Sequence, residues 1–251
     1  DFTPNVDDDN PKNYFGAFTY DASGSSVQQF EHGFGFTPDF LWIKNLSSSS
    51  GTHWIYDRVR GFTNYDFSGA TGLTPTSSAI EGGDVTLGPI IEPSTVTPTP
   101  PTYNISTHIT IRDGNSGGVD TYNTNYPGHD YVVWGWEAGG KPTHDNDNTS
   151  GAMDDNSVSL NGVLQSSYTP SGSPTIYPKR MSVNTNTGFS IIKWVGNNTN
   201  NATIPHGLTK TPDFVLLKNT SDSVNWLVKL NPDSIPAIFF FSKLHTAIIC
   251  F

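Results

Sequence analysis

The chain has 251 residues and a formal net charge of −10, and only 14% of its residues are charged, against 24 glycines and 18 prolines. This length allows one large or two ordinary domains, each able to bury a core. A helical protein would need more Glu, Lys, Ala and Leu, so the composition favours an all-β chain of short strands and turn-rich loops with almost no helix. The negative charge argues against nucleic acid and anionic membranes as partners. No apolar run reaches about 18 residues, so we expect no membrane insertion.

Residues 1–12, DFTPNVDDDNPK, form an acidic leader that we expect to be an extended arm. Its three adjacent aspartates could hold a cation, but such a run is more often simply solvated. The sequence begins without a methionine or a signal-like stretch, which predicts a processed chain or a fragment. The single cysteine, Cys250, excludes an internal disulfide.

A first strand is predicted at residues 14–20 (YFGAFTY), and residues 31–45 (EHGFGFTPDFLWIKN) then open a pattern that returns at residues 205–219 (PHGLTKTPDFVLLKN). The two copies align without a gap at an offset of 174 residues, so the chain is a tandem repeat. Within each copy, Thr-Pro favours extended backbone, and the apolar run that follows predicts a buried strand ending at Lys-Asn. The repeated residues expected to carry this architecture are His32, Gly33, Pro38, Asp39, Phe40, Lys44, His206, Gly207, Pro212, Asp213, Phe214 and Lys218.

Each copy contains a His-Gly pair, which we expect to lie in a turn, since glycine adopts backbone angles closed to other residues. A repeated histidine could also be a metal ligand. Neither copy offers a second histidine or a cysteine at metal-ligand spacing, so a turn or capping role is favoured over a metal site.

The remaining patterns divide the chain into a first module at residues 13–140, a linker at residues 141–156 and a second module at residues 157–251. Strands are predicted at residues 53–56, 107–111 and 131–136 in the first module, with a proline-rich surface excursion at residues 89–102. The second module has a similar pattern of predicted strands, at residues 189–195, 214–217 and 224–228. After Leu230 the sequence reads NPDSIPAIFFFSKLHTAIICF, so this module looks incomplete.

The apolar tail needs burial, because an exposed patch of this kind exceeds what monomers tolerate. We therefore expect a homo-oligomer in which the tail, or the arm at residues 1–12, adds a strand to the open sheet edge of a neighbour.

The motif series HGFGFTPDFLWIKN, HWIYDRVRG, DYVVWGWEAGG, MSVNTNTGFSIIKWVGN and HGLTKTPDFVLLKN resembles the repeated module of tail-fibre-like and other virion structural proteins of marine tailed phages, notably those of cyanobacteria. The resemblance covers about residues 14–57, 131–140 and 181–228. It implies tandem antiparallel β-sandwich modules, jelly-roll or lectin-like, with long loops. It also implies a virion or extracellular location and other virion proteins as partners. Its motifs mark architecture, and no catalytic residue carries over.

Enzyme motifs are weak throughout. The GNSGG at residues 114–118 differs by one residue from the surroundings of a trypsin-like nucleophile, but no segment supplies the base, so a hairpin turn is expected. Residues 145–151 (DNDNTSG) alternate oxygen ligands as calcium loops do, although the glycine is misplaced and no bidentate glutamate follows. A calcium site there stays an alternative. The four glutamates form no paired-carboxylate motif, and phosphate-binding and zinc motifs are absent, so we expect no enzyme and no cofactor.

Two function classes remain, a structural virion subunit such as a tail fibre or decoration protein, and a carbohydrate-binding module that stacks aromatic rings on sugars. The two are compatible, since a fibre tip can bind host glycans. A secreted filament subunit unrelated to phage is a further alternative. Candidate stacking residues are Tyr65, Tyr122, Tyr126 and Tyr177, whereas the six tryptophans fall on strand patterns and are expected in the core.

Overall fold

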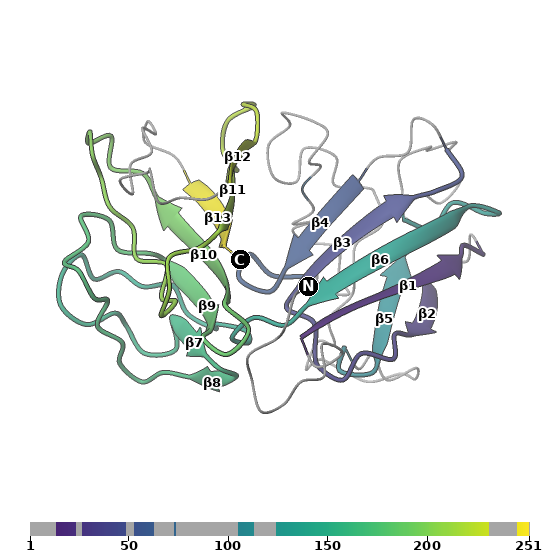
Figure 1. Cartoon of the computed structure of the whole chain (residues 1–251), viewed down its shortest axis with the longest axis horizontal. Helices are drawn as coiled ribbons and strands as arrows, with labels where there is room; N and C mark the ends of the chain where they lie inside the picture. Colours follow the sequence, from purple (N-terminus) through teal and green to yellow (C-terminus); the bar gives the residue numbers. More distant parts are fainter. Residues whose placement is uncertain are drawn as a thin grey trace. The chain divides into compact units, whose positions relative to one another are not determined.

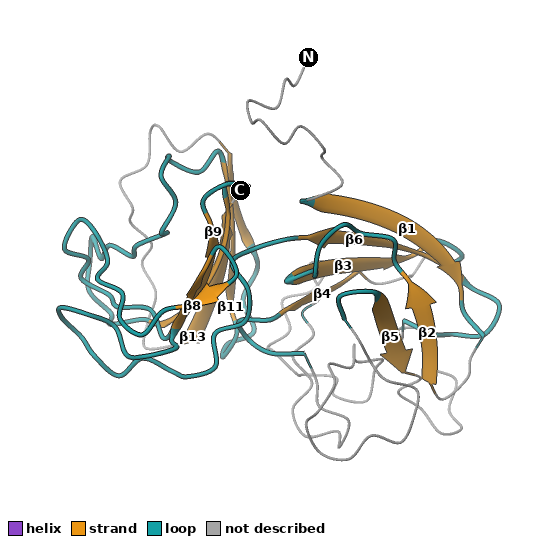
Figure 2. Cartoon of the chain, turned by 90° about the horizontal axis from the view of Figure 1, so that it is seen from below, coloured by secondary structure: helices purple, strands orange, loops and turns teal. Residues whose placement is uncertain are grey.

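The computed structural model describes residues 14–23, 27–48, 53–62, 73, 105–112, 124–230 and 245–250. These residues form strands, turns and loops without a helix, so the expected all-β fold is confirmed (Figure 2). Accordingly, the described part of the chain holds no helix long and apolar enough to cross a membrane. The predictions for residues 1–12, 89–102 and 114–118 fall outside the described residues.

The chain divides into two compact units. Unit 1 comprises Asp1–Tyr56, Phe62–Gly72 and Asp84–Glu137, and unit 2 comprises Asp57–Gly61, Leu73–Gly83 and Ala138–Phe251. The strands of unit 1 are β1 (Phe15–Asp21), β2 (Val27–Glu31), β3 (Phe40–Asn45), β4 (His53–Asp57), β5 (His108–Arg112) and β6 (Asp130–Trp136). The last residue of β4, Asp57, is assigned to unit 2. Those of unit 2 are β7 (Val158–Leu160), β8 (Val163–Leu164), β9 (Arg180–Asn184), β10 (Phe189–Val195), β11 (Phe214–Asn219), β12 (Leu227–Leu230) and β13 (His245–Cys250).

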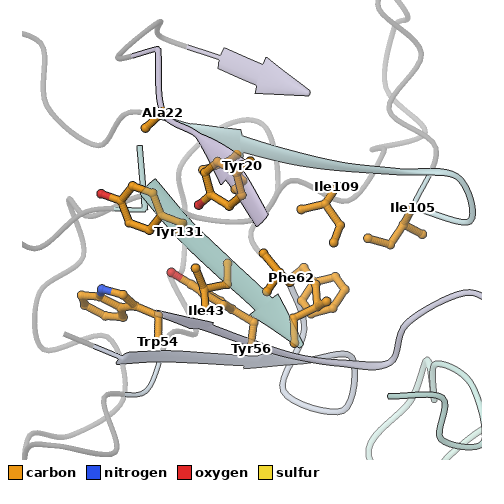
Figure 3. Close-up of a cluster of buried hydrophobic side chains, with 12 residues drawn as sticks. Tyr20, Ala22, Ile43, Trp54, Tyr56, Phe62, Ile105, Ile109 and Tyr131 are labelled. Carbon is orange, nitrogen blue, oxygen red and sulfur yellow. The ribbon is translucent and has the colours of Figure 1, made fainter. Parts of the chain in front are cut away.

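Unit 1 has a four-stranded sheet in the order β1-β6-β3-β4 and a two-stranded sheet of β2 and β5 (Figure 1). Strand alternation sends every second side chain of the larger sheet to one face. That face supplies Leu41, Ile43 and Tyr131 to a core that Ile109 and Ile111 of β5 complete (Figure 3). The buried cluster thus joins the two sheets into a sandwich-like arrangement.

Unit 2 is built on one seven-stranded sheet in the order β12-β11-β13-β10-β9-β7-β8 (Figure 1). Its neighbouring strands pair antiparallel except for β7 with β9, which is parallel. The core on one face gathers Trp194, Met181, Val183 and Leu217, with Leu208 packed at its border.

The 174-residue repeat is a repeat of structure. Shifting β1, β3 and β4 by this offset lands on β10, β11 and β12. In unit 1, β6 lies between β1 and β3, and in unit 2, β13 lies between β10 and β11. The register also agrees, because Gly16 and Leu41 both face Gly135, and their repeat equivalents Ser190 and Val215 both face Cys250.

The apparent incompleteness of the second module is therefore corrected by β13. The tail residues of this strand pair on both sides within unit 2, in the position that β6 occupies in unit 1. The expectation that the tail adds a strand to a neighbouring copy does not hold for this structure. Strand β13 pairs with two flanking strands of its own unit, so its backbone hydrogen bonds are satisfied within the same chain.

The expected linker at residues 141–156 also differs from the structure, which places these residues in unit 2. The buried Asn146 fixes the segment. Its amide nitrogen donates to the carbonyl of Pro178 at 2.9 Å, and its Oδ1 accepts from the backbone N–H of Asp154 at 3.0 Å. A segment bonded at its buried centre belongs to the domain and does not act as a spacer.

Candidate functional site

The two His-Gly turns have the same geometry. Gly33 and Gly207 have φ of 63° and 76°, in the left-handed region that favours glycine. The Nδ1 atom of His32 accepts the backbone N–H of Phe34 at 3.0 Å, and Nδ1 of His206 accepts that of Leu208 at 3.1 Å. Each histidine thus closes its own turn, as the turn and capping prediction describes.

This hydrogen bond requires an unprotonated Nδ1, so both imidazoles are held neutral. Burial lowers the pKa of His32, with a smaller lowering from His108, against an opposing effect of the bond to the Ile105 carbonyl. That bond, from His32 Nε2 at 3.0 Å, fixes the tautomer with the proton on Nε2. Burial likewise lowers the pKa of His206.

The repeated Lys-Asn pair ends each strand with a side-chain cap. Oδ1 of Asn45 accepts the backbone N–H groups of Ser47 and Ser48 at 2.9 and 3.1 Å. Asn219 makes the same turn with Ser221 and Asp222 at 2.9 and 3.0 Å. Asparagine favours such turns because its short side chain mimics a backbone carbonyl, so the repeated residue serves the fold.

The repeated lysines have different surroundings. Lys44 is half-buried, whereas Lys218 is buried and its Nζ donates to the carbonyl of Val224 at 2.6 Å. Burial lowers the pKa of Lys218. In unit 2 this lysine therefore secures the backbone that leads into β12.

The carboxylates of the loop considered for calcium are paired with other groups of the same unit. Asp145 pairs with Arg180, and Asp147 pairs with Lys179 at 2.6 Å. Asp154 accepts the backbone N–H of Asp147 at 2.6 Å. Within the described residues, no group of three or more His, Cys, Asp or Glu is placed to hold a metal ion. The loop is a structural element of unit 2.

A row of aromatic side chains lies on the face of the β1-β6-β3-β4 sheet opposite to the core. Trp136 of β6 stands between its cross-strand neighbours Phe15 and Phe40, at ring distances of 4.9 and 5.3 Å. Trp134 faces Trp42 edge-on at 6.4 Å. We call these five residues the aromatic row. Three of them, Trp42, Trp134 and Trp136, are half-buried, Phe15 is exposed, and Phe40 is buried beneath its neighbours.

One contact fixes the end of the row. The indole Nε1–H of Trp42 donates to Nδ1 of His53 on β4 at 2.8 Å. Burial lowers the pKa of His53, with a further lowering from Lys44, so the acceptor nitrogen stays free of a proton. Part-exposed rings held by neighbours form a preorganised surface for stacking.

The predicted stacking residues fare differently. Tyr65 and Tyr122 lie outside the described residues. Tyr177 is half-buried and packs against the core of unit 2, so its ring serves the core. Tyr126 is half-buried with its ring 4.5 Å from that of His129. The structure does not bring these tyrosines into the aromatic row.

The expectation that all six tryptophans are core residues is met by only two of them. Trp54 and Trp194 are buried, whereas the other four are half-buried. The signal in the sequence was the alternation in YVVWGW, which places Trp134 and Trp136 on one face and Tyr131 and Val133 on the other. Only the packing shows that the face with the two tryptophans is the outer one.

A family model described as a domain of unknown function (DUF7483) matches residues 10–82 and 166–235, more than half of the chain. Each matched segment contains one copy of the 15-residue repeat. No curated protein and no solved structure matches the chain.

Proposed function

The chain belongs to the family of the domain of unknown function DUF7483, and we propose that it is a structural virion protein of a tailed phage, a fibre or decoration subunit located on the particle. The resemblance of its motif series to virion modules of marine phages supports this role. On the particle, its partners are other virion proteins and further copies of itself.

One observation carries the proposal: repeated polar residues make hydrogen bonds within the fold. The repeated histidines close turns, the repeated asparagines cap strand ends, and Lys218 holds a backbone carbonyl. A duplicated catalytic site would instead leave such groups aimed at a substrate. Duplicated architecture with internal polar bonding fits a protein whose work is assembly and display.

Electron microscopy of native particles, labelled with antibodies raised against the purified chain, tests this role. Label on fibres or on the head is the expected result. Label confined to free filaments would replace the proposal with the secreted-filament alternative.

The aromatic row favours a second, compatible function, binding of neutral or cationic glycans of a host surface. Sugar rings present apolar faces that stack on indole, and adjacent tryptophans offer several such contacts. The protein as a whole carries a net charge of −10, which disfavours acidic glycans. At the corresponding positions of unit 2, Phe189, Ile191 and Leu216 are buried and only Phe214 is half-buried.

A glycan array probed with the full chain tests this function. Trp136→Ala should abolish the signal of the wild-type chain, because it removes the ring that lies between Phe15 and Phe40. The matched control is Trp226→Ala, which removes a half-buried indole of unit 2 and should leave binding unchanged. An array without signal for the wild-type chain would leave the structural role alone.

A further inference from the structure

Strand β12 is an edge of the seven-stranded sheet. It pairs with β11, where Leu216 faces Val228, and in the described part of the chain no strand pairs with its other side. An edge strand presents backbone N–H and C=O groups that another strand can bond. The first requirement for strand addition is therefore met.

The edge is also apolar and exposed. Val224, Leu227, Val228 and Leu230 have exposed fractions of 42%, 42%, 52% and 68%. Natural edges are blunted by charges, prolines or bulges. Lys229 is the only charged residue between Val224 and Leu230, and this stretch contains no proline.

The equivalent strand of unit 1 shows what this position holds when it is covered. In β4, Trp54, Ile55 and Tyr56 have exposed fractions of 7%, 0% and 1%. The strands β4 and β12 occupy the same place in the repeat and both are apolar. Strand β12 thus has the composition of a covered strand and the exposure of an open one.

The exposed residues select the kind of partner. Leu227 and Val228 are consecutive, so their side chains point to opposite faces of the sheet. A ligand resting on one face would cover only one of them. A strand added at the edge contacts side chains on both faces through cross-strand pairs.

We propose that β12 pairs antiparallel with β12 of a second copy of this chain, joining the two sheets across a two-fold axis. This inference rests on the assembly role proposed above and assigns it an interface. A copy of the chain brings the same unpaired apolar edge, and two-fold pairing closes the contact so that neither edge stays open.

Symmetry and charge fix the register. With the axis perpendicular to the sheet, one residue must face its own copy, because directly opposed side chains share a face. Centring on Lys229 would oppose two like charges, which is destabilising. Centring on Leu227 or Leu230 would leave most of β12 without a partner. Val228 therefore faces Val228, and Lys229 faces Leu227.

Light scattering on the full chain over a concentration series tests the interface. The wild-type chain should show at least twice the 27.3 kDa of one copy. Val228→Lys should halve the mass, because it opposes two lysines in this register. The matched control, Val163→Lys, changes a valine that is 62% exposed on β8, the other edge of the same sheet, and should keep the wild-type mass.

Mixing Val228→Lys with Val228→Glu chains should restore the dimer, since residue 228 then faces its opposite charge. A wild-type monomer, a Val228→Lys variant with unchanged mass, or a dissociated Val163→Lys control would each overturn the interface. A dissociated mixture would overturn the register. None of these outcomes alters the particle-labelling result on which the proposed function depends.

Discussion

The two units share the order and register of four strands, which are β1, β6, β3 and β4 in unit 1 and β10, β13, β11 and β12 in unit 2. The units differ in which surfaces of these strands are buried. In unit 1 the fourth strand is buried and the outer face is aromatic. In unit 2 the fourth strand, β12, is exposed, and the sheet continues at its other side, beyond β10, through β9, β7 and β8. The repeat thus fixes the strand pairing, while the surroundings of each strand decide which surface is buried.

The inner faces differ in one compensated detail. In unit 1 the ring of Phe34 lies on the cross-strand pair Gly16 and Gly135, and a Cβ on Gly135 would come within 2.5 Å of it. In unit 2 the larger Ser190 stands at the place of Gly16, and the smaller Leu208 at that of Phe34. Volume is thus exchanged between the two positions, as dense packing requires.

The largest effect is expected at the core position shared by Tyr20 and Trp194. Trp194→Ala should lower the free energy of unfolding by about 3–5 kcal/mol, because its fully buried ring leaves a large cavity. Urea denaturation followed by circular dichroism measures this loss. Trp42→Ala serves as control and should cost less, since its ring is half-buried. Equal losses would show that the two rings are equally covered.

The exchange of volume between Phe34 and Gly16 gives the next effect. Gly16→Ser should cost about 1–3 kcal/mol, because the new side chain meets the Phe34 ring. Adding Phe34→Leu should recover part of that loss by recreating the pair found in unit 2. A double-mutant cycle on the free energy of unfolding measures the coupling. Strictly additive losses would show that the two units do not share this packing rule.

The two repeated histidines, His32 and His206, predict that the stability of both units depends on pH with the same sign. Because burial lowers the pKa of His32 and His206 in the folded state, their contribution is fully present above the unfolded pKa of about 6.5 and is lost as pH falls below it. The slope is at most about 1.4 kcal/mol per pH unit for each histidine. Stability measured between pH 8 and pH 5, chosen as roughly the range around that value, checks it.

Replacing both histidines by asparagine should flatten this profile, since asparagine accepts the same backbone bond and does not titrate. A profile that keeps its slope in the double variant would assign the pH dependence to other groups.

The smallest effect is expected at the strand-end caps. Asn45→Ala and Asn219→Ala should each cost about 1 kcal/mol, because two backbone N–H groups lose their acceptor. Asn45→Asp and Asn219→Asp should retain the turn, as Asp57 does with the N–H groups of Val59 and Arg60. Thermal unfolding resolves such differences. An alanine variant as stable as its aspartate counterpart would show that the cap contributes nothing.

The positions of β3, β11 and the His-Gly turns followed from the sequence, because duplication and proline and glycine geometry are local signals. Leu41 and Val215 lie in the two repeated apolar runs that were predicted as buried strands, and both are buried at equivalent places. The closing strand β13 could not be predicted. Its sequence HTAIIC shares nothing with YVVWGW of the first module, and only long-range pairing gives the two strands the same place.

The aromatic row was missed for a related reason. Alternation shows that Trp134 and Trp136 share a face, but the sequence does not say which face another layer covers. Tyr177 shows the reverse error, because a polar loop sequence concealed its packing against the core. Exposure depends on what lies above a residue, and that information is not local.

The central claim, that β13 closes the second unit as β6 closes the first, can be tested with the single natural cysteine. Ser190 directly faces Cys250, whereas Ile191 faces Ile249. Under mild oxidation, Ser190→Cys should form a disulfide within one chain, seen by peptide mapping, and Ile191→Cys should not. A bond between two chains in Ser190→Cys, or a bond only in Ile191→Cys, would contradict the account.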